Sequence, residues 1–226
     1  MTAIPNLRAT LRTLPVLQSP STKAIDLNDF PSTPEEAFIA WLNEAILAGT
    51  QEPHAMTLST VDQHGCPDAR VLSLKDVDSR GWHFAVNGHS PKAEQLDLNQ
   101  NVALTFHWRE VGRQIRIRGK AALLSEEECR RDFQERPVRS KVAMLASKQS
   151  QRLESRGELD ARVLEVEEGL LEGADLGLMG ESALRVYAVK PSMVEFWQGS
   201  RDRLHRRIRF ITNGDRDAWV KELLWP

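Results

Sequence analysis

The sequence predicts a mainly β protein of the α+β class, an antiparallel split β-barrel with helices packed around it. Two observations lead to this prediction. From residue 55 onward, short segments alternate apolar and polar residues with a period of two, and short polar turns join them, as is typical of antiparallel strands. Helices interrupt this run without the regular strand–helix alternation of a parallel sheet. Closure into a barrel removes the exposed edges that such a sheet would otherwise have.

Composition and charge narrow the class of protein. The 226 residues are 41% hydrophobic and 27% charged, which is typical of a globular domain. No apolar run approaches the ~20 residues of a membrane helix, and the first residues lack the apolar core of a secretory signal, so we expect a cytoplasmic protein. The net charge of -2 argues against a general nucleic-acid binder. Cys66 and Cys129 lack neighbouring ligands at metal-binding spacing, so we expect reduced thiols and no metal site.

The first 34 residues are expected to form an arm outside the barrel, because they are polar and interrupted by prolines. A helix then begins within Ser32–Glu36, where a hydroxyl cap, a proline in the first turn and two acids coincide. Gly49 ends it. Apolar residues at helical spacing predict one buried face: Phe38, Trp41, Leu42, Ala45 and Ile46. We therefore divide the chain into an arm, 1–34, and a single domain, 35–226, whose last strands span 184–226.

The first half of the domain is predicted to contain five strands. Polar turns at 62–65 and 76–81 separate the first three strands, and a loop at 87–91 leads to a short helix at 92–98. Gly119 lies inside the fifth strand and is expected to mark a β-bulge. The predicted strands cover 55–61, 69–75, 82–86, 102–108 and 114–124.

Helices and then strands are predicted for the second half. A capping box at Ser125–Glu128 begins a helix that Pro137 follows and ends. The predicted helices are 125–135, 139–146 and 159–171, and the last has one apolar stripe of Leu159, Val163, Val166 and Leu170. A loop at 173–180 precedes strands at 184–190, 193–198 and 207–211. Asn213-Gly214 is typical of a hairpin turn, with its second arm at 218–224.

Basic and amide side chains are arranged along these strands in a pattern that suits an anion. Side chains alternate between the two faces of a strand. One face would carry Arg70, Leu72 and Leu74, the other Val71, Ser73 and Lys75, while Gln114, Arg116 and Arg118 share a face of the fifth strand. These residues alone leave two interpretations open. The face is either an ordinary solvated surface or an anion site where Arg and Lys hold phosphate oxygens.

Two loops carry further polar candidates. The segment 147–151 is a polar connection between helices and is ordinary by itself. Glu195–Gly199 is followed by Arg203–Arg207, which brings a Trp, a His and several Arg together in a short stretch. This stretch is either a buried aromatic beside a charged hairpin or the lining of a pocket for a planar, phosphorylated ligand. His205 would then bond to the ligand or transfer a proton near neutral pH.

In order and spacing, these segments resemble the pyridoxamine 5′-phosphate oxidases, a family of FMN-dependent split-barrel flavoenzymes. The resemblance runs from about Phe38 to Pro226. It is strongest in Val194–Gly199 and in Arg203–His205, with Arg207 and the terminal proline. The other matching stretches are Ala55-Met56, Thr60–Asp62, Arg70–Lys75, Ser90 with Lys92-Ala93, Arg113-Gln114, Gly119–Ala121, Arg136-Pro137 and Ser147–Ser150.

The resemblance implies a homodimer that binds FMN at its interface, with Gln149 and Ser150 supplied by the second subunit. At Ala85 and Val86 only the backbone can bond to the cofactor, because neither side chain has a hydroxyl group. The FMN-binding residues implied by the resemblance are Arg70, Val71, Leu72, Ser73, Leu74, Lys75, Ala85, Val86, Ser90, Lys92, Gln114, Gln149, Ser150, Trp197 and Arg207.

The resemblance also implies an activity, the oxidation of pyridoxamine or pyridoxine 5′-phosphate to pyridoxal 5′-phosphate with oxygen as acceptor and hydrogen peroxide as by-product. Lys75, Arg136 and Ser140 would hold the substrate phosphate. The segment Arg203-Leu204-His205 would lie over the pyridine ring, and Arg203 and His205 would orient the reacting carbon as catalytic residues. Neither a membrane nor a nucleic acid is expected as a partner.

Two residues depart from the family pattern and keep other functions open. Pro91 stands where the family has an Arg for the FMN phosphate, and a proline offers no donor. Asp132 stands where the family has a Tyr for the substrate phosphate, and a carboxylate repels a phosphate. Asp132 favours an FMN-dependent oxidase of another ring compound, such as a phenazine precursor. Pro91 favours a non-catalytic binder of flavin or of a B6 phosphate.

Overall fold

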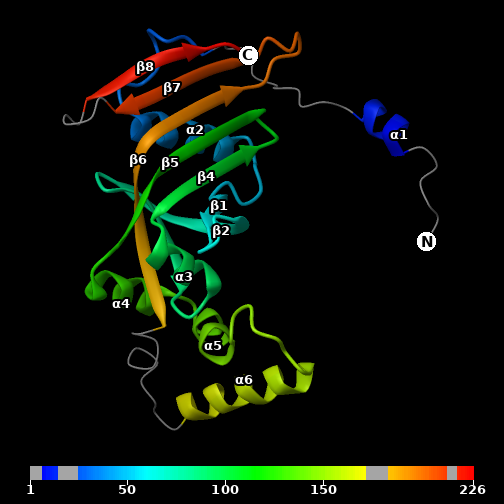
Figure 1. Cartoon of the computed structure of the whole chain (residues 1–226), viewed down its shortest axis with the longest axis vertical. Coiled ribbons are helices and arrows are strands. Elements are labelled where there is room, and N and C mark those ends of the chain that lie inside the picture. Colours follow the sequence, from blue (N-terminus) through cyan, green and yellow to red (C-terminus); the bar gives the residue numbers. More distant parts are fainter. Residues whose placement is uncertain (1–6, 15–24, 172–182, 213–217) are drawn as a thin grey trace.

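The computed structural model describes residues 7–14, 25–171, 183–212 and 218–226. Within them the chain forms both helices and strands (Figure 1). The helices are α1 Leu7–Thr13, α2 Pro34–Leu47, α3 Pro91–Leu98, α4 Glu126–Glu135, α5 Val138–Ala146 and α6 Arg156–Leu171. The strands are β1 Ala55–Val61, β2 Pro67–Asp78, β3 Gly81–Asn87, β4 Asn101–Trp108, β5 Arg113–Leu123, β6 Leu184–Gln198, β7 Arg206–Thr212 and β8 Trp219–Leu224.

Six of the strands close into an antiparallel barrel in the order β3-β2-β1-β4-β5-β6, and a β3–β6 pairing completes the circle. The prediction of an antiparallel barrel with helices outside it is confirmed. Strands β7 and β8 continue the sheet from β6 beyond the barrel. Since β6 pairs with β3 at residues 184–189 and with β7 at residues 193–198, one strand belongs to both parts (Figure 1).

The continuity of β6 corrects the prediction of two separate strands at 184–190 and 193–198. Pro191 lies opposite Gly119 of β5, at the point where the register shifts between Arg118 and Gly119. A proline lacks the N–H that a regular ladder needs, and the bulge accommodates it without ending the strand. The bulge predicted at Gly119 is confirmed. A Cβ at this position would lie 2.2 Å from the carbonyl oxygen of Lys190, so only glycine fits.

Strand β2 is longer than predicted, and this shortens the turn predicted at 76–81. A register shift between Leu74 and Asp76 keeps residues 76–78 paired with β3. The turn is therefore confined to the residues just before Gly81, whose φ is 115°. Helix α6 begins at Arg156, three residues before its predicted start. The predicted loop at 173–180 and the turn at Asn213-Gly214 lie outside the described residues.

Helix α2 packs against the barrel through its aromatic side chains. The predicted capping box is present, with the Thr33 hydroxyl accepting from the backbone N–H of Glu36. Phe38 is fully buried, and its ring contacts those of Trp82, Phe106 and Trp108. These contacts fix α2 across the barrel, where large apolar side chains supply most of the stabilisation.

The arm divides into two parts. Ile25, Leu27 and Phe30 pack against the core, and Lys221 of β8 donates from Nζ to the carbonyl oxygens of Leu27 and Phe30 at 3.1 and 2.9 Å. Helix α1 is absent from the sequence prediction. It has no buried residue and lies apart from the barrel (Figure 1). Residues 25–30 of the arm therefore pack on the barrel domain, whereas α1 does not.

Helices α3 to α6 gather at one end of the barrel (Figure 1). Cys129 and Phe133 of α4 form a second apolar cluster with Leu184 and Val186 of β6. The predicted stripe on α6 is half-buried at Leu159, Val163 and Val166. Across the described ranges, none of the helices combines the length and apolar character needed to cross a membrane.

Candidate functional site

A cavity of about 290 Å³ opens where β2, β3, α3 and the loop after α5 meet. Its walls combine apolar side chains with two cations, two amides and a hydroxyl group. The lining residues are Leu72, Ala85, Val86, Asn87, Lys92, Arg136, Ala143, Met144, Ser147 and Gln149. Of these, Leu72, Ala85, Val86, Lys92, Arg136 and Gln149 were predicted as cofactor or substrate residues. The cavity thus brings together residues that lie far apart in the sequence.

Lys92 is the buried cation of this cavity. Its side chain is only 6% exposed, because α3 begins beside the barrel wall, and its Nζ donates to Gln149 Oε1 at 2.8 Å. Burial lowers the pKa of Lys92, and the positive charge of Arg70 lowers it further. Burial disfavours the charged form of a lysine, so an anion bound here would raise the pKa again. The arrangement is therefore suited to hold a phosphate or a carboxylate.

Ser90 and Arg70 flank this lysine. Ser90 is fully buried and donates its hydroxyl to the carbonyl oxygen of Asn87 at 2.6 Å, so it does not cap α3 but keeps its acceptor lone pairs. Arg70 of β2 donates from Nη1 to Thr60 Oγ1 at 2.6 Å and also pairs with Asp68. Both residues are positioned by bonds to their own chain, although neither lines the cavity itself.

A second cation of the cavity, Arg136, is held by Asp132. Arg136 ends α4 and donates from Nε and Nη2 to Asp132 Oδ2, both at 3.0 Å. Lys75 of β2 lies with its Nζ 3.9 Å from Asp132 Oδ1. Two of the three residues predicted to hold a substrate phosphate therefore surround one carboxylate. The third, Ser140, is exposed on α5.

The remaining predicted residues form a second group on neighbouring strands. Gln114 of β5 pairs with Trp197 of β6, which in turn pairs with Arg207 of β7. Arg207 is fixed by Glu195, whose Oε1 accepts from its Nε at 3.0 Å, and by the carbonyl oxygen of Trp225. Glu195 is buried, so its carboxylate holds the guanidinium of Arg207 in one orientation. Sequence reasoning missed this role of Glu195, because the pairing depends on the β6–β7 register.

The Arg203–His205 loop belongs to the same group. The His205 ring centroid lies 4.8 Å from that of Trp197, and His205 Nδ1 accepts from the backbone N–H of Ser200 at 3.1 Å. This bond leaves the proton of a neutral imidazole on Nε2. Arg203 is exposed and has a positive φ of 64°, a conformation that costs energy in a non-glycine residue and is frequent at functional sites.

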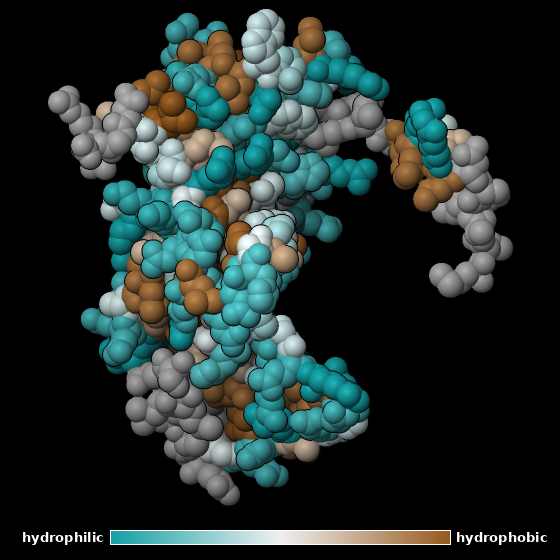
Figure 2. Space-filling model, in the orientation of Figure 1, coloured by the Kyte–Doolittle hydropathy of each residue, from teal (hydrophilic) through white to brown (hydrophobic). Residues whose placement is uncertain are grey.

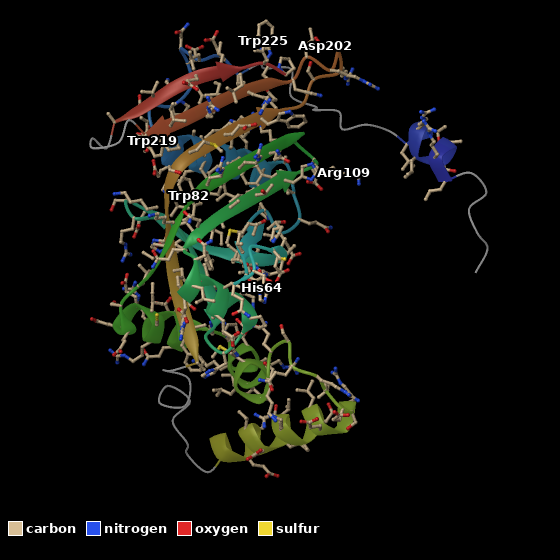
Figure 3. The ribbon with its side chains drawn as sticks, viewed as in Figure 1. His64, Trp82, Arg109, Asp202, Trp219 and Trp225 are labelled. Atoms are coloured by element: carbon tan, nitrogen blue, oxygen red, sulfur yellow. The ribbon has the colours of Figure 1, made fainter. Side chains whose placement is uncertain are left out.

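The two groups lie at different ends of the molecule. Figure 1 shows α3 and α5 at one end of the barrel, and the β4–β5 turn and β6–β7 loop near the other. In Figure 3, Arg109 and Asp202 mark those two connections, on the side that carries the second group. In one chain the two groups of predicted residues therefore lie apart.

Gln149, which the resemblance assigns to the second subunit, also has a partner within its own chain. Gln149 bonds to Lys92 of its own chain, because α5 ends at Ala146 beside α3 and the following loop turns back over the cavity. Ser150 is exposed with a positive φ of 68°. On β2, Val71 and Ser73 are exposed and alternate with the half-buried Leu72, as the period of two predicts, and neither of them lines the cavity.

Several lining residues were not predicted. Asn87 ends β3, while Met144 and Ser147 come from α5 and its end. Their placement depends on how α5 packs, for which the sequence carries no local signal. Asn87, Met144, Ser147 and Gln149 also line an adjoining cavity of about 410 Å³, where Lys148 and Arg162 lie. The two cavities therefore share these four residues as a common wall.

One cluster of metal-binding residue types occurs in the described part of the chain. Ligand atoms of Asp76, Asp78 and His83 lie within 4.8 Å of one another. The Asp78 carboxylate already accepts from Arg80 Nε and Nη2 at 2.9 and 2.7 Å, and lies 3.1 Å from His83 Nε2. These bonds lower the pKa of Asp78 to about 2, chiefly through Arg80. The Asp78 carboxylate is thus already engaged by Arg80 and His83.

Comparison with known proteins places this geometry in a family. Residues 42–168 match the family model described as pyridoxamine 5′-phosphate oxidase, and residues 185–226 match the pyridoxine 5′-phosphate oxidase C-terminal dimerisation region. A pyridoxine/pyridoxamine 5′-phosphate oxidase of Thermosynechococcus vestitus is 38% identical over the full length of both chains. One of Vibrio campbellii is also 38% identical, over 88% of this chain and 92% of that protein.

Two solved structures share the fold. PhzG from Burkholderia lata 383, in complex with tetrahydrophenazine-1-carboxylic acid, aligns with a TM-score of 0.79 at 31% identity, covering 90% of this chain and 98% of PhzG. A pyridoxamine 5′-phosphate oxidase-related, FMN binding protein from Nostoc punctiforme PCC 73102 aligns with a TM-score of 0.66 at 17% identity, over 87% of this chain and 100% of that protein. With both family models matched in order and full-length relatives at this identity, the chain belongs to the pyridoxamine 5′-phosphate oxidase family.

Proposed function

We propose that this protein is an FMN-dependent oxidase of pyridoxamine 5′-phosphate and pyridoxine 5′-phosphate, which yields pyridoxal 5′-phosphate and hydrogen peroxide with oxygen as acceptor. The observation that carries the proposal is the cavity built around buried Lys92 in a chain of this family. The curated relatives of similar length carry this activity in their names, which supports the same substrates here.

The residues of the cavity fit FMN. Lys92 provides a buried cation for the phosphate, and Ser90 provides a hydroxyl beside it. Leu72, Ala85 and Val86 provide an apolar wall against which a planar ring can pack. The loss of an arginine at Pro91 is compatible with this fit, because proline is well accommodated as the first residue of a helix and Lys92 follows directly.

The second group is proposed to complete the site across a two-fold axis. The C-terminal strands match a dimerisation region, and Leu204, Leu223 and Trp225 leave large apolar side chains exposed there. Figure 2 shows apolar residues gathered over the β7–β8 end. In a dimer, Gln114, Trp197 and Arg207 of the partner subunit would face the Lys92 cavity. We accordingly propose 35–226 as one FMN-binding domain whose strands at 184–226 dimerise, with 1–34 as an arm.

The roles of the chain's own residues follow from their geometry. Bound FMN supplies a hydride acceptor that oxygen regenerates. Lys75 and Arg136 bind the phosphate of the substrate, with Ser140 adding a hydroxyl. His205, whose Nδ1 is occupied by the N–H of Ser200, presents Nε2–H as a donor to the substrate ring and thereby orients the reacting carbon with Arg203. Arg207, fixed by Glu195, places a positive charge beside the flavin.

A spectrum and a turnover assay test the activity. Purified protein should be yellow, and pyridoxamine 5′-phosphate under air should consume oxygen and form an aldehyde. A colourless protein that ignores added FMN in a titration would contradict the proposal. Yellow protein that oxidises neither B6 phosphate would favour the second candidate, an oxidase of another ring compound, for which the likeness to PhzG and the ion pairs of Asp132 are the supporting observations.

Mixed dimers test the shared site. Lys92→Met and Trp197→Ala should each lower FMN occupancy, since each damages one half of every site. When the two variants are unfolded together and refolded, random pairing gives half heterodimers, each with one intact site, so about a quarter of the sites should recover. Recovery would require both halves in trans. Equal occupancy in mixed and unmixed samples would show that each chain builds its own site.

A further inference from the structure

Asp132 occupies a particular place among the cations of the proposed substrate site. It lies on the last turns of α4, four residues before Arg136, and one oxygen, Oδ2, accepts both guanidinium bonds at 3.0 Å. The side chains of Asp132 and Arg136 are only 18% and 17% exposed. A pair this well covered is screened less by solvent than an exposed one.

The second oxygen of Asp132 faces a cation from a different element. Lys75 of β2 has its Nζ 3.9 Å from Asp132 Oδ1, so one carboxylate bridges α4, the α4–α5 junction and the barrel wall. Two cations with one carboxylate leave a formal charge of +1 where the cations alone would leave +2. The carboxylate therefore stands where an external anion would be held by Lys75 and Arg136.

We infer that Asp132 is a specificity-determining residue that competes with the substrate's phosphate for Lys75 and Arg136, so that the site discriminates weakly in favour of phosphorylated rings and accepts ring substrates of lower negative charge. This inference rests on the proposed function, which assigns the phosphate to these two cations. A phosphate dianion must share or displace the Asp132 carboxylate, whereas an unphosphorylated ring leaves these ion pairs closed. The competition with Asp132 therefore weakens the binding of phosphorylated rings only.

A pair of unreactive ligands that differ only in the phosphate measures this penalty. The probes are 4-deoxypyridoxine 5′-phosphate and 4-deoxypyridoxine, which lack the group that is oxidised, and their Kd values are measured by calorimetry on the FMN-loaded protein. Asp132→Asn keeps the size and one acceptor oxygen but removes the charge. We expect it to lower the Kd of the phosphorylated probe about tenfold, as removal of a like charge beside a partly covered anion does, and to leave the other Kd within about twofold.

Asp160→Asn is the matched control. Asp160 also pairs with an arginine four residues away, with its Oδ1 3.7 Å from Arg156 Nε, but this pair is exposed on α6. It should change neither Kd. If circular dichroism shows that Asp132→Asn folds poorly, Asp132→Ser serves as a second variant. The same two Kd values are measured for it, and the same changes are expected.

Three outcomes overturn the inference. An unchanged Kd for the phosphorylated probe would show no competition, and a higher one would show that Asp132 orients Arg136 for phosphate binding. Equal changes for both probes would show a structural role. The proposed function and the inference fail in different ways. If the wild type does not oxidise pyridoxamine 5′-phosphate, the proposed function is wrong. If Asp132→Asn has the same preference between the two probes as the wild type, the inference is wrong.

Discussion

Replacement of Lys92 by methionine should weaken FMN binding and raise the stability of the protein without bound FMN. The substitution keeps the length of a side chain that is 6% exposed and removes the charge and the bond to Gln149. A charge-assisted hydrogen bond to a phosphate contributes ~1.5–3 kcal/mol, so FMN affinity should fall roughly 10- to 100-fold. In the absence of FMN the buried charge is a cost, as the lowered pKa of Lys92 indicates, so the variant should unfold at a higher temperature.

The pH dependence of the free protein gives this prediction a second reading. The pKa of Lys92 is lower in the folded protein than its usual 10.5, so the folded state binds fewer protons than the unfolded one between the two values. The cost is fully present below the folded-state pKa and disappears as the pH rises through it toward 10.5. The stability advantage of Lys92→Met should therefore shrink at alkaline pH.

Fluorescence titration with FMN and thermal unfolding with and without FMN measure both effects. Lys120→Met is the control, because Lys120 is an exposed lysine on β5. Lys120→Met should leave the FMN affinity unchanged. The protein with FMN should still melt at a higher temperature than the protein without it. The reasoning would be refuted by FMN affinity of Lys92→Met within about threefold of the wild type, or by a lower melting temperature of the free variant.

Three further predictions concern the fold and the second group. Asp78→Asn should lower the free energy of unfolding by about 1 kcal/mol at pH 7, because Arg80 lowers the pKa of Asp78 to about 2 and the pair is partly exposed. In urea unfolding, the difference from the wild type should disappear as the pH falls from about 4 to 2. Gly119→Ala should lower the free energy of unfolding by at least about 2 kcal/mol, because the new Cβ would meet the carbonyl oxygen of Lys190; an unchanged urea midpoint would contradict this. Glu195→Gln should reduce FMN affinity about tenfold, because it removes the charge that holds Arg207 and leaves the bond to Trp225 as its remaining anchor. Dimerisation, measured by light scattering, should not change, because Leu204, Leu223 and Trp225 stay in place.

The barrel could be predicted because its signals are local. The period of two in β1 to β5, the capping boxes of α2 and α4 and the isolated Gly119 each act within a few residues of the chain. The errors arose where a distant partner decides the structure. Pro191 suggested a break, but the bulge opposite it keeps β6 continuous. A register shift beside Leu74 extends β2 because β3 continues to pair with it.

Several residues that line the cavity could be predicted, but their grouping could not. Lys92, Arg136 and Gln149 were identified from short matches to the family, and the cavity brings them together. That Gln149 bonds to its own chain depends on the packing of α5 beside α3, which no short motif encodes. Asn87 and Met144 line the cavity for the same reason. The sequence also showed Asp132 as a departure, but only the structure shows that it pairs with both Arg136 and Lys75.

The length of β6 supports the proposal that two copies of the chain enclose one flavin. Val186 of β6 pairs with Ala85 beside the cavity, and Trp197 lies eleven residues further along the same strand. At about 3.3 Å per residue, an extended strand separates these positions by up to ~36 Å, well beyond the reach of one bound FMN. The pairing of β5 with β6 along most of this distance holds the two ends of β6 apart. We infer that the long strand gives the barrel its closure and, by the same geometry, requires a second subunit to supply Trp197 and Arg207 to each cavity.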